Sequence, residues 1–138
     1  MNRKALELLY HQTTYTVHTL MQIFKLRVNQ NNEDFQNWLH QNEINTWAMM
    51  TAANPYSIEQ TEEKNVKLNA KFENQLQEKN LTHYYSEGIP DNLNWSIEIG
   101  FFLPNISLNS AKQLAAAVQQ NAIVFGGVGA TAQLIWLE

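Results

Sequence analysis

The 138-residue sequence contains no cysteine. A disulfide framework, a thiol nucleophile and thiolate metal ligands are therefore excluded. Long apolar runs are also missing, since none approaches the roughly 20 residues of a membrane-spanning helix. The N-terminal stretch MNRKALELLYHQ has neither an apolar h-region nor a small-residue cleavage site. We therefore expect a cytoplasmic protein that has no membrane partner.

Positive charge is scarce. The chain has nine Lys and Arg against 13 Asp and Glu, which gives a net charge of -4. Four of the basic residues, Lys64, Lys67, Lys71 and Lys79, belong to one segment, where they alternate with acids and form no cluster. Binding to a nucleic-acid backbone requires a basic face, so nucleic acid is not expected as a partner.

Motifs for metals and cofactors are missing too. The four histidines, His11, His18, His40 and His83, are far apart in the sequence and lack HExxH or i,i+4 spacing, so neither a metal site nor a cofactor is expected. The stretch GGVG at 126–129 lies between two predicted strands, whereas a phosphate-binding loop needs a helix after it. It is typical of a hairpin turn.

Amides are abundant instead. The chain contains 17 Asn and 12 Gln, and they are scattered among apolar residues, which argues against a prion-like tract. Hydrophobic residues make up 44% of the chain, an ordinary share for a globular protein. This length and composition predict one domain over residues 1–138 that buries about two thirds of its unfolded surface.

Two interpretations fit the N-terminal part. In the first, residues 2–12 form a short amphipathic helix, and the alternating stretches 14–18 and 22–28 form strands. In the second, one helix runs from residue 4 to residue 21, because the apolar residues of this stretch also fit a helical stripe. The threonines of this stretch favour the strands.

The rest of the chain alternates between helical and strand patterns. Asn32 is a predicted helix cap because two acids follow it, and Ser107 is a predicted cap because an alanine-rich stretch follows it. The near-continuous apolar run at 45–53 is typical of a central strand covered on both faces. The predicted elements are helix 32–41, strand 45–53, helix 58–79, strand 81–86, turn 87–94, strand 95–103, helix 107–120 and strands 121–125 and 132–137.

From residue 45 onward, this order is βαββαβ followed by one more strand. It predicts an α+β fold with a ferredoxin-like βαββαβ core, a mainly antiparallel sheet and two helices on one face. The N-terminal helix and hairpin would extend or cover that core. A strand at 45–53 lying parallel to the strand at 121–125 would overturn the order.

The segment MMTAANPYS, residues 49–57, ends an apolar strand in a polar group. Asn54 before Pro55 favours leaving the strand, because a residue before proline avoids helical angles. Ser57 followed by Gln60 fits a capping box at the start of the next helix. A strand-to-helix turn explains Pro55 and Ser57, but it explains Asn54 less well.

Two more amides lie on the apolar stripe of the predicted helix 58–79. Asn65 and Asn69 are one turn apart and share a face with Leu68, Phe72 and Leu76. A buried polar group without a partner costs about 1–3 kcal/mol, so both amides need neighbours. They either bond loop backbone or line a polar pocket.

The ferredoxin-like order brings these positions to one edge of the sheet. The end of the first strand, the start of the first helix, the loop after the second strand and the start of the last strand meet there. The start of the helix also offers free N–H groups, which suit a carboxylate or phosphate. The predicted site residues are Asn54, Tyr56, Ser57, Asn65, Asn69, Trp95, Glu98, Gln120 and Asn121, together with the loop Gly88 to Asn94.

The string TAANP, from Thr51 to Pro55, followed by Asn65 and Asn69 four residues apart, resembles a bacterial family of domains of unknown function catalogued as number 3293. The resemblance covers roughly residues 5–125. It implies no known activity, cofactor or substrate.

Other stretches share in this resemblance. The string GIPD at 88–91, then Trp95 and Glu98, is similar to the central loop and strand of the family, and QNA at 120–122 is similar to its late motif. Two features differ. The arginines that such proteins often carry along the long helix are lysine or neutral here, and the spacing from Trp95 to Glu98 is shifted by one. Both differences weaken an inherited role for Glu98 or for an anion clamp.

Three functions remain open. The first is a binding module that holds a small anionic or amide-bearing ligand, or a peptide end, at the polar edge. The second is an interaction or self-association module that uses that edge or an exposed strand. The third is a hydrolase or transferase with Glu98 as general base, which would require burial to raise the pKa of Glu98. A cleft of several hundred Å³ at Asn54 would favour the first, and a flat apolar patch would favour the second.

Overall fold

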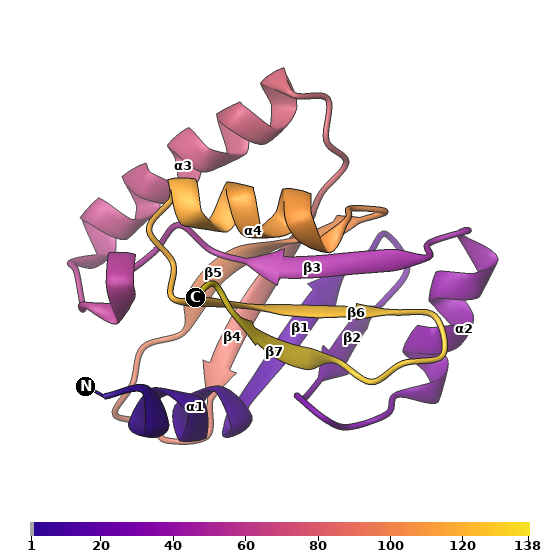
Figure 1. The fold of residues 1–138 in the computed structure, drawn as a ribbon, viewed down its shortest axis with the longest axis horizontal. Helices are drawn as coiled ribbons and strands as arrows, with labels where there is room; N and C mark the ends of the chain where they lie inside the picture. The colour runs from indigo at the N-terminus through magenta and orange to yellow at the C-terminus, as the bar shows by residue number, and fades with distance from the viewer. Residues whose placement is uncertain (1) are drawn as a thin grey trace.

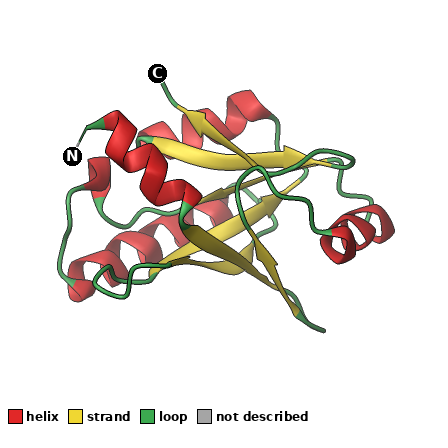
Figure 2. Ribbon diagram, turned by 90° about the horizontal axis from the view of Figure 1, so that it is seen from below, coloured by secondary structure: helices red, strands yellow, loops and turns green. Residues whose placement is uncertain are grey.

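The computed structural model describes residues 2–138 as a mixed α/β fold built on one antiparallel sheet of seven strands (Figure 1). Short nine-residue helices, α1 and α2, lie at opposite ends of the molecule, as Figures 1 and 2 both show. The elements are α1 (Arg3–His11), β1 (Thr13–His18), β2 (Ile23–Leu26), α2 (Glu33–Gln41), β3 (Thr46–Met50), the 3-10 turn η1 (Pro55–Ser57), α3 (Glu62–Glu78), β4 (Tyr84–Pro90), β5 (Glu98–Pro104), α4 (Leu108–Ala117), β6 (Ala122–Gly127) and β7 (Gln133–Trp136).

The strand order across the sheet is β2-β1-β4-β5-β3-β6-β7. The central strand β3 pairs antiparallel with β5 and with β6, and Ala48 lies between Leu103 and Phe125. The parallel pairing that would have overturned the predicted order is therefore not what the structure has. The hairpin of β1 and β2 extends the sheet beyond β4, and β7 extends it beyond β6.

Each face of the sheet has its own apolar core. Helices α3 and α4 lie side by side on one face (Figure 1), where Phe72 and Ala115 pack in a cluster with Phe101 and Ile123 of the strands. On the other face the sheet curls around α2. There, Phe35 and Leu39 of α2 pack with Trp47, Phe102 and strand residues of the hairpin. The near-continuous apolar run of β3 follows from this burial on both faces.

The structure settles the two interpretations of the N-terminal part. Helix α1 ends at His11 and β1 begins at Thr13, so the single helix from 4 to 21 is wrong. The Thr13 hydroxyl donates a hydrogen bond of 2.7 Å to the Leu9 carbonyl, at the point where the chain leaves the helix. The β-branched residues of 13–17 then pair with both β2 and β4.

The predicted start of the long helix is wrong. Helix α3 begins at Glu62 rather than at residue 58, and its N-cap is Thr61, whose hydroxyl accepts a hydrogen bond from the Lys64 N–H. Ser57 is therefore not a helix cap, and the capping box of Ser57 and Gln60 does not form. Glu62 and Glu63 follow Thr61, and acids in the first turn favour a helix start at that position.

Other boundaries shift for reasons of pairing. The stretch 87–90, predicted as part of a turn, continues β4 because β1 pairs with residues Ser86 to Pro90. Strand β3 ends at Met50 rather than at residue 53, and β5 starts at Glu98 rather than at residue 95. The caps Asn32 and Ser107 are confirmed, since each side chain accepts the expected backbone N–H.

Candidate functional site

The turn after β3 has an unusual backbone. Asn54, Tyr56 and Ser57 have φ angles of 48°, 54° and 61°, in the left-handed region that costs an L-residue about 1–2 kcal/mol. The segment after α4 holds this turn in place. The Tyr56 N–H donates to the Gln119 carbonyl at 2.6 Å, and the Asn121 amide donates to Ser57 Oγ at 2.9 Å. Two segments far apart in the sequence therefore fix the turn together.

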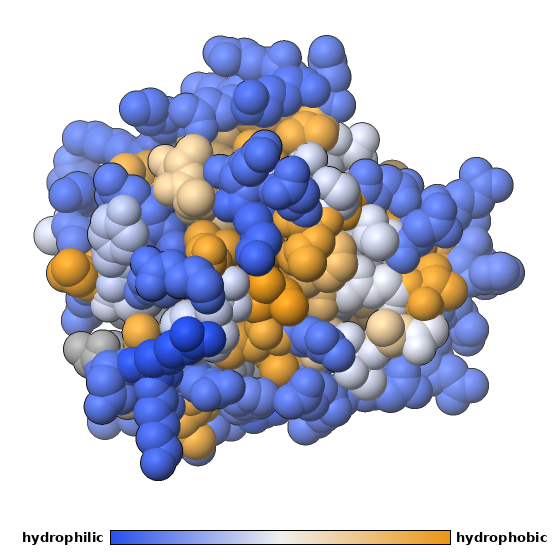
Figure 3. Space-filling model, viewed as in Figure 1, coloured by the Kyte–Doolittle hydropathy of each residue, from blue (hydrophilic) through white to orange (hydrophobic). Residues whose placement is uncertain are grey.

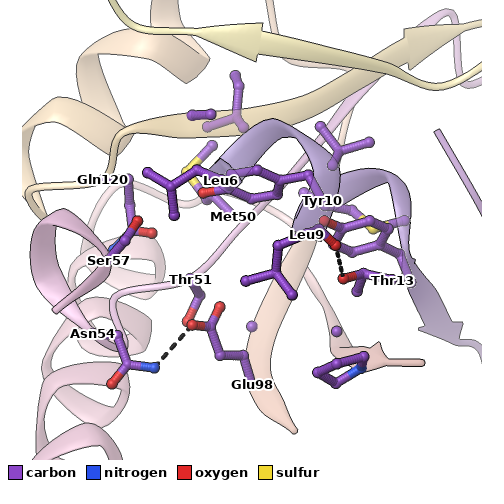
Figure 4. Close-up of a pocket in the computed structure, with 18 of the residues that line it drawn as sticks. Leu6, Leu9, Tyr10, Thr13, Met50, Thr51, Asn54, Ser57, Glu98 and Gln120 are labelled. Carbon is purple, nitrogen blue, oxygen red and sulfur yellow. Dashed lines mark hydrogen bonds between the residues drawn. The ribbon is translucent and has the colours of Figure 1, made fainter. Parts of the chain in front are cut away.

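Asn54 is the centre of a hydrogen-bond network. Its backbone N–H donates to Asn65 Oδ1, and Asn65 Nδ2 donates back to Asn54 Oδ1, both at 2.9 Å. The Gln60 N–H also donates to Asn54 Oδ1, at 2.9 Å. The Asn54 side-chain amide donates in turn to Glu98 Oε2 at 2.9 Å (Figure 4). This network explains an asparagine here better than a simple turn does.

Asn69 joins two strand segments beneath the turn. The buried Asn69 side chain accepts from the Ala52 N–H and donates to the Ile99 carbonyl, both at 2.9 Å. The Thr51 hydroxyl donates to the same carbonyl at 2.6 Å. The two helix amides thus bond the end of β3, the turn and β5, and neither of them bonds the loop at 88–94.

Glu98 is partly buried at the start of β5. Among residues 2–138, Asn54 alone donates a hydrogen bond to its carboxylate, and it reaches only Oε2. Loss of hydration on burial raises the pKa of Glu98 above its ordinary value, and the hydrogen bond from Asn54 opposes that shift. The carboxyl group therefore retains acceptor capacity in a poorly hydrated place.

A cavity of about 140 Å³, here called the α1 cavity, lies between α1 and the sheet. Figure 4 shows Leu6, Leu9 and Tyr10 of α1 on one side of it, and Glu98 and Asn54 on another. The pKa of Tyr10 is raised to about 12, mainly by burial and secondly by the charge of Glu98, while a hydrogen bond with Ser57 opposes the shift.

A second hollow, here called the α3 groove, has a volume of about 680 Å³ and runs between α3 and β5. Asn65 and Asn69 line it from α3, and Ile97 and Ile99 line it from the other side. The α1 cavity and the α3 groove share four lining residues, which are Asn54, Glu59, Ser96 and Glu98. Glu98 therefore borders both hollows.

The structure brings most of the predicted site residues together. Asn54, Ser57, Trp95, Glu98 and Gln120 line the α1 cavity. The remaining amides of the network, Asn65 and Asn69, line the α3 groove. The other two line neither hollow: Tyr56 lies within the turn and exposes 56% of its surface, and Asn121 bonds Ser57.

Sequence reasoning missed the contribution of α1. Leu6, Leu9 and Tyr10 form one wall of the cavity, and Tyr15 of β1 lines it as well. Burial holds the pKa of the Tyr15 phenol well above its ordinary value. The amphipathic stripe of residues 2–12 indicates a buried helix face, but no local pattern tells which part of the fold that face covers.

The charge at both hollows is negative. Glu59 and Glu98 line both, while Glu62 and Glu73 line the groove only. No Lys or Arg of residues 2–138 lines either hollow. The start of α3, where an anion was expected, instead carries Glu62 and Glu63 in its first turn. These carboxylates occupy the positive end of the helix dipole.

Within residues 2–138, no group of three or more His, Cys, Asp or Glu side chains is arranged to hold a metal ion. In the same residues, no helix is both long and apolar enough to cross a membrane.

Comparison with known proteins gives a family and nothing closer. The family model described as "Protein of unknown function (DUF3293)" matches residues 50–123, which is more than half of the chain. This range runs from the last residue of β3 to the start of β6, and it includes the turn, the amides of α3 and Glu98. Neither the curated proteins nor the solved structures include a match.

Proposed function

Since the chain belongs to the DUF3293 family, whose description names no activity, we propose from the geometry that it is a binding module for a small ligand at Glu98. One observation carries this proposal. Glu98 lines both the α1 cavity and the α3 groove, and Asn54 is the only hydrogen-bond donor to its carboxylate among residues 2–138.

The surroundings of Glu98 suit a preformed site. Small-molecule sites are mostly apolar hollows with a few polar groups in fixed positions. Asn54, Asn65 and Asn69 use their amide groups to hold the turn and the ends of β3 and β5. Because these bonds fix the backbone around Glu98, a ligand finds the carboxylate already in place, which reduces the entropy lost on binding.

The charge of the lining favours a ligand that donates hydrogen bonds. Of the two ligand types that the sequence suggests, an amide-bearing molecule fits an unpaired carboxylate oxygen, while an anion would face Glu59 and Glu98 with no cation in the lining. A ligand with N–H groups is therefore the better candidate.

Catalysis by Glu98 is a second candidate. A general base needs a raised pKa and a hydroxyl or water within reach. Burial supplies the raised pKa. No hydroxyl of residues 2–138 donates a hydrogen bond to Glu98, whereas Thr51 donates to a backbone carbonyl. The site therefore supports binding more directly than catalysis.

Self-association is a third candidate, and one observation favours it. Strand β7 is an edge of the sheet, with partly exposed Leu134, Ile135 and Trp136, and unpaired edges can pair with another chain. Figure 3 shows apolar side chains gathered on the face that carries β6 and β7. Under this alternative, stability would depend on protein concentration.

We also propose that the core is ferredoxin-like. The spatial order β4-β5-β3-β6, with every neighbouring pair antiparallel and with α3 and α4 on one face, supports this assignment.

Thermal melting against a panel of small amides, amines, sulfate and phosphate tests the binding proposal. A ligand at a hundredfold excess over its Kd adds about 2.7 kcal/mol to stability, which is visible as a higher Tm. We expect amides or amines to raise the Tm of the wild type, and Glu98→Gln to lose the effect.

The matched control is Glu63→Gln. Glu63 is an exposed acid of α3 that pairs with Lys67, so its removal changes the net charge equally without touching either hollow. The control should keep the ligand effect. A Tm that rises only with protein concentration would favour self-association, and a panel that raises the Tm of neither protein would contradict the binding proposal.

A further inference from the structure

We infer that the ligand held at Glu98 is a primary amine in its ammonium form, attached to an apolar body about the size of a benzene ring. This inference rests on the proposed function and names its ligand class. Three features of the site lead to it, namely its charge, the size of its apolar cavity and the number of acceptor atoms that remain free.

The negative charge of the site favours a positively charged ligand. Glu59 and Glu98 line both hollows, and no Lys or Arg of residues 2–138 balances them. A carboxylate that has lost part of its hydration is costly unless an opposite charge or several donors replace the water. Glu98 has one neutral donor, Asn54. An ammonium group supplies the missing charge.

The size and lining of the α1 cavity favour a ligand with a compact apolar body. Its volume of about 140 Å³ is close to that of an engineered apolar cavity of about 150 Å³ that binds benzene. Leu6, Leu9 and Met50 supply aliphatic surface, and Tyr10 and Tyr15 supply aromatic rings. A cation is also attracted to the faces of such rings.

The free acceptors favour an ammonium over a guanidinium. Asn54 already takes one of the two acceptor sites of Glu98 Oε2, so a guanidinium that binds both oxygens at once would have to share Oε2 with the Asn54 amide. An ammonium carries three donors that rotate freely. Gln120 donates through its Nε2 to the Ala53 and Val118 carbonyls, so its Oε1 is a second acceptor in the same lining.

Binding of this kind depends on pH. An ammonium binds the ionised carboxylate, while burial raises the pKa of Glu98 and so favours the protonated form in the free protein. A proton therefore competes with the ligand. The affinity should be full above the pKa of Glu98 in the free protein and should fall as the pH drops through it.

Three probes of equal size separate the possible ligand classes: benzylamine, benzyl alcohol and benzoate. Isothermal calorimetry on the full chain at pH 8 should show benzylamine binding at least tenfold more tightly than benzyl alcohol, and no binding of benzoate. Lowering the pH to 4 should weaken benzylamine, because protons then compete for the Glu98 carboxylate. Benzyl alcohol should bind equally at both pH values.

Two variants locate the binding. Glu98→Gln keeps the shape of the side chain, so it should weaken benzylamine at least tenfold while leaving benzyl alcohol unchanged, which also shows that the variant is folded. Leu9→Phe places a ring in the cavity wall and should weaken benzylamine and benzyl alcohol together. Glu63→Gln, at a residue that lines neither hollow, should change neither affinity.

The outcomes distinguish this inference from the proposed function. Benzoate or benzyl alcohol that binds as tightly as benzylamine, still in a Glu98-dependent way, overturns the ligand class and leaves the binding module standing. Benzylamine that binds Glu98→Gln as tightly as the wild type overturns the inference. Failure of all three probes, while an amide of the broader panel binds at Glu98, overturns the inference alone.

Discussion

The two ends of the molecule are each closed by a nine-residue helix, yet they are filled differently. At the α2 end, Phe35 packs edge-on against Trp47 with ring centroids 5.5 Å apart, and Trp47 stacks on Phe102 at the same separation. The neighbouring position 126 requires glycine, because a Cβ there would lie 2.5 Å from the Trp47 ring. The α1 end retains a cavity of about 140 Å³.

Polar groups follow the opposite trend. Within residues 2–138, the buried side-chain nitrogen or oxygen without a hydrogen-bond partner is Trp47 Nε1, at the densely packed α2 end. At the α1 end, the amides of Asn54, Asn65 and Asn69 all have partners. Filling space and satisfying polar groups are therefore separate tasks. At the α1 end the framework amides are satisfied, while space and one oxygen of the Glu98 carboxylate remain free for a ligand.

The largest expected effect on stability comes from a substitution at the densely packed α2 end. Phe35→Ala removes a ring that touches Phe24, Trp38, Trp47 and Phe102, and such a loss costs about 3–5 kcal/mol of unfolding free energy. Urea denaturation measures it. Ligand affinity of the folded fraction should not change, because Phe35 does not line the α1 cavity. A loss of affinity that exceeds the loss of folded protein would contradict the separation of the two ends.

The next effect tests the amides of the other end. Asn69→Leu leaves the buried Ala52 N–H and the Ile99 carbonyl without their partner, so it should cost about 1–3 kcal/mol. Asn65→Leu should lower the free energy of unfolding by less, because Asn65 is partly exposed. It should instead loosen the turn at 54–57.

Denaturation curves and hydrogen exchange of the turn amides compare these two variants. If Asn65→Leu destabilises the whole protein as much as Asn69→Leu while the turn stays protected, the distinction between the structural and the turn-holding amide is wrong.

A smaller effect concerns pH. Burial raises the pKa of Glu98 in the folded state, so protonation of this carboxyl group favours folding. Its contribution to the unfolding free energy is complete below the unfolded pKa of about 4.3. That contribution is lost as the pH rises through the folded pKa. Glu98→Gln removes this dependence, so it should gain stability relative to the wild type as the pH rises through this window. Denaturation at pH 4 and pH 7 measures the difference, and a gain at the lower pH would contradict the sign.

The smallest effect concerns the strained turn. Tyr56→Gly relieves a φ angle of 54° at an exposed side chain and should raise the unfolding free energy by up to about 1 kcal/mol. Ile58→Gly is the matched control: Ile58 is also exposed, but its φ of -94° is relaxed, so glycine should destabilise there. Equal changes in the two variants would mean that the turn stores no strain.

The contrast between the two ends also shows how far sequence reasoning reaches. The caps at Asn32 and Ser107 were predictable because capping depends on neighbouring residues alone. Asn54 and Asn65 were placed together because the order of strands and helices brings their segments to one edge. Ser57 was misplaced as a cap because Thr61, with its two following acids, competes for the same role. The left-handed backbone of Tyr56 is held by the hydrogen bond that its N–H donates to the Gln119 carbonyl of a distant segment.

The wall contributed by α1 was beyond prediction for a different reason. Leu6, Leu9 and Tyr10 reach the cavity only because β1 pairs with β4, and no local pattern specifies that pairing. The charge environment of Glu98 likewise depends on residues from α1, the turn and the stretch before β5. Long-range contacts of this kind leave no periodic signal in the sequence.

The pairing of β1 with β4 has a consequence for the order of folding. Thr13 lies opposite Pro90, and Arg27 bonds Asp91 across 64 positions of the chain. Contacts so distant in sequence form slowly, because a long loop must first close, and its closure lowers the entropy of the chain before the contacts stabilise it. During synthesis from the N-terminus, the first two strands must wait for β4 to be made. The α1 cavity should accordingly be among the last features to form, so a ligand that binds there selects chains that have completed folding.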